Sequence, residues 1–249
     1  MYVLTIDQRG SSTDVDRVPG LLAELTRLLP GATFERSVGD ELQGVLRSPA
    51  EVVDTALHVL RDGHWYVGIG VGAVDRPLPA SPREGSGPAF VAARLAVERA
   101  KAAGHVPLAV AAGTAGTPRR GAASRPAGSG DGAAGTPAAA PPGEREAANA
   151  EAVLRLIGRL VQDRTTAQWK VVDALRGVRD GRAGTHGSQK AAAAALGITE
   201  QSVSRALLRS AWQEEWAARP AAEMLLALAD GQTTGADGHA ARTPSEGDR

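Results

Sequence analysis

Four polar side chains that can hydrogen-bond to the edges of DNA bases lie close together in the C-terminal half of the chain. They are Glu200, Gln201, Ser204 and Arg205. Arginine pairs with guanine and glutamine with adenine through two hydrogen bonds each, whereas glutamate accepts from cytosine. If one helix presents all four side chains to solvent, they have the chemistry to read a base sequence in the major groove.

The segment from Ser188 to Leu208, SQKAAAAALGITEQSVSRALL, supplies such a helix, because its spacing predicts a helix-turn-helix. Ala192 and Ala193 are small where two helices must cross closely, and Gly197 provides the turn with positive φ. Thr199 is placed to cap the second helix. The residues expected to face the core are Ile198, Val203, Ala206 and Leu207.

Basic residues surround this motif. From Arg164 to Arg209 the chain has eight lysines and arginines against three acidic residues, although its formal net charge is zero. The basic residues are Arg164, Lys170, Arg176, Arg179, Arg182, Lys190, Arg205 and Arg209. A local positive field attracts the phosphate backbone. We therefore expect double-stranded DNA as the partner and add Lys190, Thr199 and Arg209 to the predicted contacts.

Two other interpretations of the motif stay open. Two short helices joined by a glycine turn also occur in proteins that bind no nucleic acid. An adaptor protein, in addition, can use a helix-turn-helix as a contact for another protein. Such an adaptor would not retard DNA at low salt, and it would retain a bound protein in a pull-down.

The composition excludes several classes of protein. The 249 residues contain no cysteine, which rules out disulfides, thiol nucleophiles and cysteine-ligated metal sites. The five histidines have no paired metal-ligand spacing. The N-terminus enters a strand pattern directly, and no apolar stretch approaches the length of a membrane span. We therefore expect a cytoplasmic protein without a membrane partner.

The first 112 residues have the pattern of an α+β domain. Strands are expected at residues 2–6, 33–38, 42–46, 65–74 and 106–112, and helices at 14–29, 52–60 and 88–103. Glycines in the fourth strand suggest that another element packs close to its backbone. This order predicts a ferredoxin-like sheet with helices on one face.

Composition divides the rest of the chain into three parts. Residues 113–143 are rich in glycine, alanine and proline and predict a disordered linker. Residues 144–230 predict an all-α DNA-binding domain that contains the helix-turn-helix. Residues 231–249 are polar and glycine-rich and predict a disordered tail.

Within the helical domain, helices are expected at 144–163 and 166–175, before the helix-turn-helix. The second helix of the motif should run on through Trp212 and Trp216, and Pro220 should start another helix. Because operators are usually read by dimers, we expect a homodimer. Its candidate surfaces are the helix at 144–163 and the face that carries Trp212 and Trp216. Either surface can equally belong to the core of one chain, and we expect this for the two tryptophans.

Four blocks follow one another in the N-terminal domain: YVLTID, RSVGDELQGVL, YVGIGVGAV and GPAFVAARLAVERAKAAGH. In order and spacing they resemble palm-type nucleotidyl cyclases, which include the class III adenylate cyclases and the diguanylate cyclases. Together with QWKVVDAL and the helix-turn-helix, the two-part arrangement is more similar to the bacterial SatD (secretion and acid tolerance) family. The resemblance covers nearly the whole chain apart from the linker and the tail.

The cyclase resemblance implies a site for metal ions. In active cyclases a carboxylate at the end of the first strand and another in the hairpin turn hold two divalent cations that clamp the triphosphate. By position, Asp7 and Asp40 correspond to these residues. Glu41 matches the glutamate of the diguanylate cyclase signature, and Arg94 matches the arginine that contacts developing phosphate charge. The resemblance thus implies Mg²⁺ with a nucleotide as ligands.

Other positions depart from the cyclase pattern. Arg36 stands where class III cyclases that use ATP have a base-recognising lysine, and Phe90 stands where they have a catalytic asparagine. Val38 and Leu42 replace a glycine and a phenylalanine of the diguanylate cyclase signature. Because phenylalanine cannot donate a hydrogen bond to the transition state, we predict that the domain has lost turnover.

The acidic residues also have an ordinary structural interpretation. Gly39 and Asp40 can form a simple hairpin turn, and Asp7 can cap a neighbouring helix. Arg94 can pair with Asp40 or Glu41. A pocket that retains a metal or nucleotide without catalysis is the intermediate hypothesis, because acidic groups at neighbouring strand ends repel one another without a cation.

The sequence therefore predicts a DNA-binding transcription regulator with an N-terminal domain that senses a nucleotide or mediates assembly. The alternative is a metal-dependent nucleotidyl cyclase-type enzyme that acts on nucleoside triphosphates.

Overall fold

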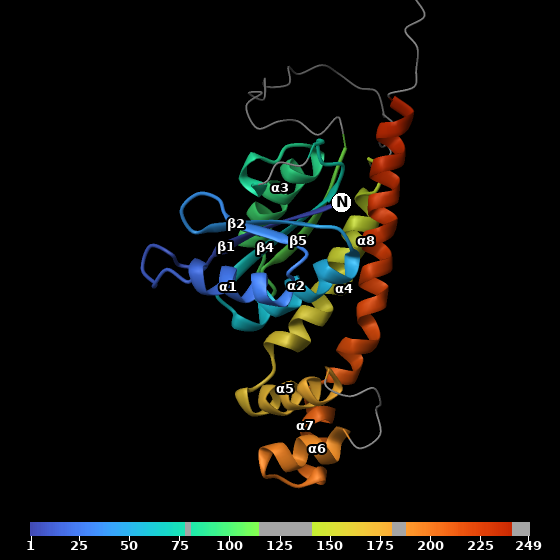
Figure 1. The fold of residues 1–249 in the computed structure, drawn as a ribbon. Helices are drawn as coiled ribbons and strands as arrows, with labels where there is room; N and C mark the ends of the chain where they lie inside the picture. Colours follow the sequence, from blue (N-terminus) through green and yellow to red (C-terminus); the bar gives the residue numbers. More distant parts are fainter. Residues whose placement is uncertain (78–80, 115–140, 181–187, 241–249) are drawn as a thin grey trace, which may run out of the picture.

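A mixed sheet organises the N-terminal part of the protein (Figure 1). The computed structural model describes residues 1–77, 81–114, 141–180 and 188–240, without the side chains of 178–180 and 236–240. In these ranges the strands are β1 (Tyr2–Gln8), β2 (Thr33–Arg36), β3 (Glu41–Leu46), β4 (Trp65–Gly72) and β5 (Leu108–Gly113). Their order is β2-β3-β1-β4-β5, in which β4 and β5 are parallel and all other neighbours are antiparallel.

Eight α-helices accompany the sheet in the described residues. They are α1 (Val18–Leu28), α2 (Pro49–Asp62), α3 (Pro88–Ala102), α4 (Glu144–Gln162), α5 (Thr166–Asp180), α6 (Ser188–Leu196), α7 (Glu200–Arg209) and α8 (Trp212–Ala240), with a short 3-10 helix, η1 (Pro82–Glu84). The predicted order of strands and helices over the first 112 residues is confirmed. Of the helices described, none is long and apolar enough to cross a membrane.

Local sequence accounts for the ends of helix α2. Ser48 accepts a hydrogen bond from the Glu51 N–H, and the Glu51 carboxylate accepts one from the Ser48 N–H. This reciprocal capping box satisfies backbone groups that the first turn leaves unpaired. The helix ends at Gly63, whose φ of 75° is the left-handed conformation that glycine adopts without strain.

Helices cover both faces of the sheet, whereas the sequence predicted them on one face. Leu4 and Ile6 of β1 are buried in a large core with α1 and α2, while Val3 is buried against Phe90 of α3 on the other face. Figure 1 shows α3 across the sheet from α2 and α4. The prediction was wrong because β1 is apolar at consecutive positions, and such a strand is buried on both faces.

Helix α3 packs directly on the backbone of β4, which confirms the close approach predicted from the glycines of that strand. A Cβ added at Gly68 would lie 2.3 Å from the Val97 nitrogen, and one added at Gly70 would lie 2.0 Å from the Ala89 carbonyl oxygen. Both contacts are with helix backbone, which cannot turn aside as a flexible side chain would. The two glycines therefore set the distance between α3 and the sheet.

The large core continues from the sheet into the C-terminal helices. Leu154 and Ile157 of α4 and Leu226 of α8 belong to the same buried cluster as Ile69 and Leu108 of the sheet. Helix α4 packs against α8 and β5, and α8 also packs against α2. In Figure 1, α8 runs beside α4 along one side of the molecule. The boundary that composition predicts at residue 144 is therefore not a boundary of the packed core. Most of the predicted linker, residues 115–140, lies outside the described residues.

The connection between α7 and α8 differs from the continuous helix that we predicted. The chain breaks at Ser210 and Ala211, and Ala211 has a φ of 47°. A non-glycine residue in this conformation interrupts the helix and gives α8 a new direction. Pro220, predicted to start a helix, lies inside α8.

Helix α8 also extends into the predicted tail. It continues to Ala240, and Thr233 is fully buried in it. The Gln232 side chain accepts a hydrogen bond of 3.2 Å from the Gly143 N–H at the start of α4. These contacts hold the first residues of the polar segment in the helix. Residues 241–249 lie outside the described residues.

A buried group of charges joins α8 to α2 and α5. Glu215 of α8 is 0% exposed and pairs with Arg164, Arg176 and Arg219. The Arg176 Nη2 and Arg219 Nε atoms lie 3.3 Å and 3.0 Å from Glu215 Oε1. Arg219 also pairs with Asp54 of α2. We call these five residues the Glu215 cluster, and it fixes the helices α5 to α7 against the rest of the protein.

A second contact between α2 and α5 lies nearby. The Arg61 guanidinium donates two hydrogen bonds of 2.7 Å to the carboxylate of Asp173. The guanidinium carbon of Arg61 lies 3.9 Å from the centre of the Trp169 ring, and that of Arg164 lies 4.8 Å from it. Trp169 therefore contributes both apolar burial and cation–π contacts to this junction.

The close approach of α3 predicts a large difference between two Gly→Ala variants. Gly70→Ala should lower the free energy of unfolding by about 1–3 kcal/mol, because α3 has to move to admit the new Cβ. Gly20→Ala in α1 is the control, since nothing lies within 4 Å of the added Cβ. It should be neutral or should stabilise by about 0.5–1 kcal/mol. Urea denaturation measures both, and equal effects would contradict the close approach.

The Glu215 cluster predicts that Glu215→Gln lowers the free energy of unfolding by about 3–5 kcal/mol, because removing the central charge leaves buried guanidinium groups uncompensated. Glu214→Gln, at the exposed neighbouring position, should change it by less than about 0.5 kcal/mol. Thermal and urea unfolding of the two variants give the comparison. A mild effect at Glu215 would show that the cluster does not hold the helices together.

Candidate nucleic-acid interface and carboxylate site

Helices α5, α6 and α7 form a small bundle at one end of the molecule (Figure 1). Its interior is made by Val172 of α5, Ala192 and Ala193 of α6, and Val203 and Leu207 of α7, all buried. The two predicted helices of the motif are confirmed as α6 and α7.

The turn at Gly197 and the N-terminal cap of α7 also have the structure that the sequence predicts. Gly197 has a φ of 66°, and the Thr199 hydroxyl accepts a hydrogen bond of 3.2 Å from the Ser202 N–H. Ile198, in contrast, is 40% exposed although we predicted that it faces the core. It lies in the turn before α7 begins, where helical spacing no longer decides the direction of the side chain.

The predicted DNA contacts share one property, exposure to solvent. They are Lys190 of α6, Thr199 at the cap, and Glu200, Gln201, Ser204, Arg205 and Arg209 of α7. Val203 and Leu207 occupy the opposite side of α7. The bundle therefore brings the predicted contacts together on and beside one helix.

The positive field around α7 is weaker than the sequence predicted. Arg164 is buried against Glu215, and Arg176, whose side chain is 33% exposed, pairs with the same carboxylate. Lys170, Lys190, Arg205 and Arg209 remain exposed, whereas Arg182 and the side chain of Arg179 lie outside the described residues. The count from the sequence included Arg164 and Arg176, because no residue near them in the chain indicates that Glu215 of α8 pairs with both.

The acidic residues predicted for a metal site lie at neighbouring strand ends. Asp7 of β1 and Glu41 of β3 are cross-strand partners, and Asp40 precedes Glu41 in the turn. The Lys101 ammonium of α3 lies 2.9 Å from Asp7 Oδ2 and 3.3 Å from Glu98 Oε1. The positive charge beside Asp7 in this structure is therefore that of a lysine.

The pKa values of the two strand carboxyls reflect burial. Burial raises the pKa of Asp7, although its hydrogen bond to Lys101 acts in the opposite direction. Burial also raises the pKa of Glu41, against a hydrogen bond with Ser37 and the charge of Arg94. Since the charges of Asp40 and Glu98 also raise the pKa of Asp7, and the charge of Asp7 raises the pKa of Glu41, the site has acidic character that Lys101 only partly compensates.

The residues present do not fit a metal centre. Within the described part of the chain, no group of three His, Cys, Asp or Glu side chains is arranged to hold a metal ion. Two residues that depart from the cyclase pattern have structural partners. Arg36 pairs with Asp16 at 2.7 Å, and Phe90 packs against Gly85, where a Cβ would meet its ring.

Sequence reasoning missed three polar residues at this site. Lys101 follows Arg94 by two helical turns, so its position on the same side of α3 was open to inference from the sequence. Thr5 and Gln43 are cross-strand partners, and their buried side-chain polar atoms have no hydrogen-bond partner in the structure. No local signal reveals these two, because burial of a polar strand residue depends on which element covers it.

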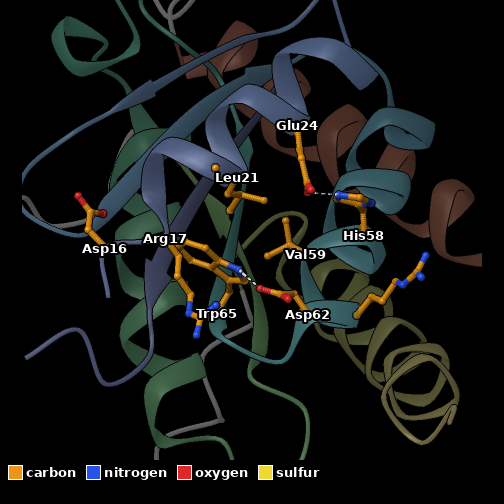
Figure 2. Close-up of a pocket in the computed structure, with 10 residues that line it drawn as sticks. Asp16, Arg17, Leu21, Glu24, His58, Val59, Asp62 and Trp65 are labelled. Carbon is orange, nitrogen blue, oxygen red and sulfur yellow. Dashed lines mark hydrogen bonds and ion pairs between the residues drawn. The ribbon is translucent and has the colours of Figure 1, made fainter. Parts of the chain in front are cut away.

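A cavity of about 610 Å³ lies elsewhere, between α1, α2 and the start of β4 (Figure 2). Leu21, Val59 and Trp65 supply its apolar wall. His58 Nε2 lies 3.1 Å from Glu24 Oε2, and the Trp65 indole N–H donates to Asp62 at 3.1 Å. Figure 2 shows both pairs beside the cavity. None of the residues that we predicted for a DNA or metal site lines this cavity.

The raised pKa of Glu41 predicts a pH-dependent effect of Glu41→Gln. The Glu41 carboxyl has a higher pKa in the folded than in the unfolded chain, so its protonated form favours folding. This contribution to stability is lost as the pH rises through the pKa of the folded state. The variant, which cannot ionise, should thus be more stable than the wild type at pH 7–8. The difference should fade as the pH falls below the ordinary value of 4.5. Urea unfolding across this range measures it, and a difference that is largest in acid would contradict the sign.

No protein-family model, no curated protein and no solved structure matches this chain. The resemblances to the SatD family and to the cyclases therefore stay predictions from the quoted motifs.

Proposed function

We propose that this protein is a sequence-specific DNA-binding regulator and that α7 is its recognition helix. The observation that carries the proposal is the two-sided character of α7. Val203 and Leu207 are buried, while Gln201, Ser204 and Arg205 face solvent. A helix held on one side by two supporting helices presents its other side, which is polar apart from the exposed Leu208, in a fixed orientation, and direct reading of bases requires such an orientation.

The exposed basic residues suit the backbone contacts of such a complex. Lys190 lies on α6 and Arg209 at the end of α7, so both flank the side chains assigned to base reading. Contacts to phosphate set register and orientation without carrying sequence information. We assign Gln201, Ser204 and Arg205 to bases and Lys190 and Arg209 to phosphates.

For the sheet, we propose a ferredoxin-like, cyclase-like domain of a SatD-type protein that binds a nucleotide or mediates assembly without turnover. The connection β1-α1-β2-β3-α2-β4 and the order β2-β3-β1-β4 support the fold assignment. The ion pair of Lys101 with Asp7 favours a site that has exchanged a cation for a lysine. A regulator of this kind would act in the cytoplasm.

The DNA-binding role predicts different effects of two substitutions. On a site selected from a random DNA library, Arg205→Ala should weaken specific binding by about 1–3 kcal/mol and relax the base preference at one position. Lys190→Ala should weaken binding to all sequences alike. The slope of the logarithm of the affinity against the logarithm of the salt concentration should fall by the share of about one phosphate contact. Fluorescence anisotropy at several salt concentrations separates the two effects.

Arg27→Ala is the matched control, because Arg27 is an exposed arginine in the last turn of α1. It should leave both affinity and salt dependence unchanged. If the wild-type chain retards no DNA at low salt but retains a protein in a pull-down, the bundle is an adaptor and the proposal is wrong. If DNA binds but Arg205→Ala has no effect on the selected site, α7 does not read bases through Arg205.

A further inference from the structure

One side chain on the solvent side of α7 is apolar. Leu208 is 77% exposed, which is the largest exposed fraction among the large apolar side chains of the described residues. All of α7 belongs to these residues, and it exposes no second large apolar side chain. Val203 and Leu207 already fill the side of α7 that faces the bundle. Packing within the chain therefore does not account for a leucine at position 208.

Leu208 shares its side of the helix with the residues that we assign to base reading. With about 3.6 residues per turn, it follows Ser204 and Arg205 by about one turn and Gln201 by about two turns. Because each residue is rotated by about 100° from the one before it, Leu208 points in a direction between those of Ser204 and Arg205. We call Gln201, Ser204, Arg205 and Leu208 the reading side of α7. Its apolar member thus lies near the middle of the set.

The charges around Leu208 favour DNA over a protein partner. Arg205 and Arg209 lie within three residues of it and are exposed, whereas the acidic residue of α7, Glu200, begins the helix. A protein contact is centred on a contiguous apolar patch, and one leucine between two guanidinium groups does not form such a patch. DNA offers phosphates to the guanidinium groups and base edges to the side chains between them. A nucleic acid therefore suits the reading side.

The major groove presents one apolar group, the C5-methyl group of thymine, among the hydrogen-bond donors and acceptors of the four bases. We propose that Leu208 contacts this methyl group, so that the DNA site of the protein contains a thymine opposite Leu208. The contact removes two apolar groups from water together, which is favourable. The inference rests on the proposed function, because it requires α7 to lie in the major groove.

The spacing along α7 places this thymine close to the base that Arg205 contacts. Leu208 lies three residues after Arg205, which is about 4.5 Å along the helix axis. Neighbouring base pairs are about 3.4 Å apart along DNA. A helix that follows the groove therefore sets the methyl group within about two base pairs of the base read by Arg205. Since arginine pairs best with guanine, the site should contain a guanine and a thymine at this distance.

The test removes the methyl group alone. Deoxyuridine pairs with adenine as thymidine does and lacks only the C5-methyl group. On a site selected from a random DNA library with the full chain, each thymidine is replaced in turn by deoxyuridine, and fluorescence anisotropy gives each affinity. For the wild type, the replacement opposite Leu208 should weaken binding about fourfold, the effect of one methyl group that is buried in the contact. This thymidine should lie within about two base pairs of the position at which Arg205→Ala relaxes the base preference.

Two variants assign the effect to Leu208. Leu208→Ala should bind the thymidine and the deoxyuridine duplex with about equal affinity, because the shorter side chain does not reach the methyl group. Its urea unfolding midpoint should be that of the wild type, since the leucine side chain is exposed. Leu28→Ala is the matched control, because Leu28 is a 47% exposed leucine at the end of α1. It should keep the fourfold difference between the two duplexes.

The outcomes separate this inference from the proposed function. If the wild type binds its selected site but no deoxyuridine weakens binding, the inference is wrong and DNA binding stands. A methyl effect that persists in Leu208→Ala assigns the contact to another residue and also overturns the inference. If Leu208→Ala lowers the mass of the chain in solution, as measured by light scattering, Leu208 belongs to a protein contact and the inference is wrong. A wild-type chain that binds no DNA contradicts the proposed function and, with it, this inference.

Discussion

The buried carboxylate of Glu215 is the constraint on which the arrangement of the whole chain depends. A charge that is 0% exposed is tolerated only when its hydrogen-bonding capacity is filled, and Arg164, Arg176 and Arg219 fill it from three parts of the sequence. Through Arg219 the same group reaches Asp54 of α2. Because Asp54 lies on α2 and Arg176 on α5, whereas Arg219 lies on α8 with Glu215 itself, the cluster forms only when these three helices occupy their observed positions.

This constraint changes how the two functional parts relate to each other. A chain whose parts are joined by a loose linker communicates mainly through local concentration. Here α8 packs against the sheet layer along α2 and α4, and its first turns hold the helix-turn-helix bundle through Glu215. The Arg61–Asp173 pair also joins α2 to α5, so the bundle and the sheet layer are connected by packed helices as well as by the chain between them.

The carboxylate site is assembled by β1, β3 and α3 together. Asp7 and Glu41 lie at neighbouring strand ends because the antiparallel register of β1 and β3 pairs them. Lys101 is placed beside them by α3, and the glycines of β4 allow α3 to come close enough. The buried polar atoms of Thr5 and Gln43 lie on the same two strands. The site thus combines acidic groups with the ammonium of one lysine.

The sequence by itself determined the features that depend on residues near one another in the chain. These are the order of strands and helices in the first 112 residues, the cap at Thr199, the turn at Gly197 and the polar side of α7. Helical and strand periodicity, caps and glycine turns are local signals, and the structure follows them. The close approach of α3 was also visible, since glycines in a strand leave room for backbone contact.

Only the tertiary structure decided which distant side chains meet. The inward turn of Arg164 and Arg176, the placement of Lys101 beside Asp7, and the packing of α4 and α8 on the sheet have no local signal. Composition placed a boundary at residue 144, but burial of apolar surface by α4 and α8 extended the core across it. Charged partners and shared cores are selected by the packing of whole elements, and a pattern along one segment does not contain that information.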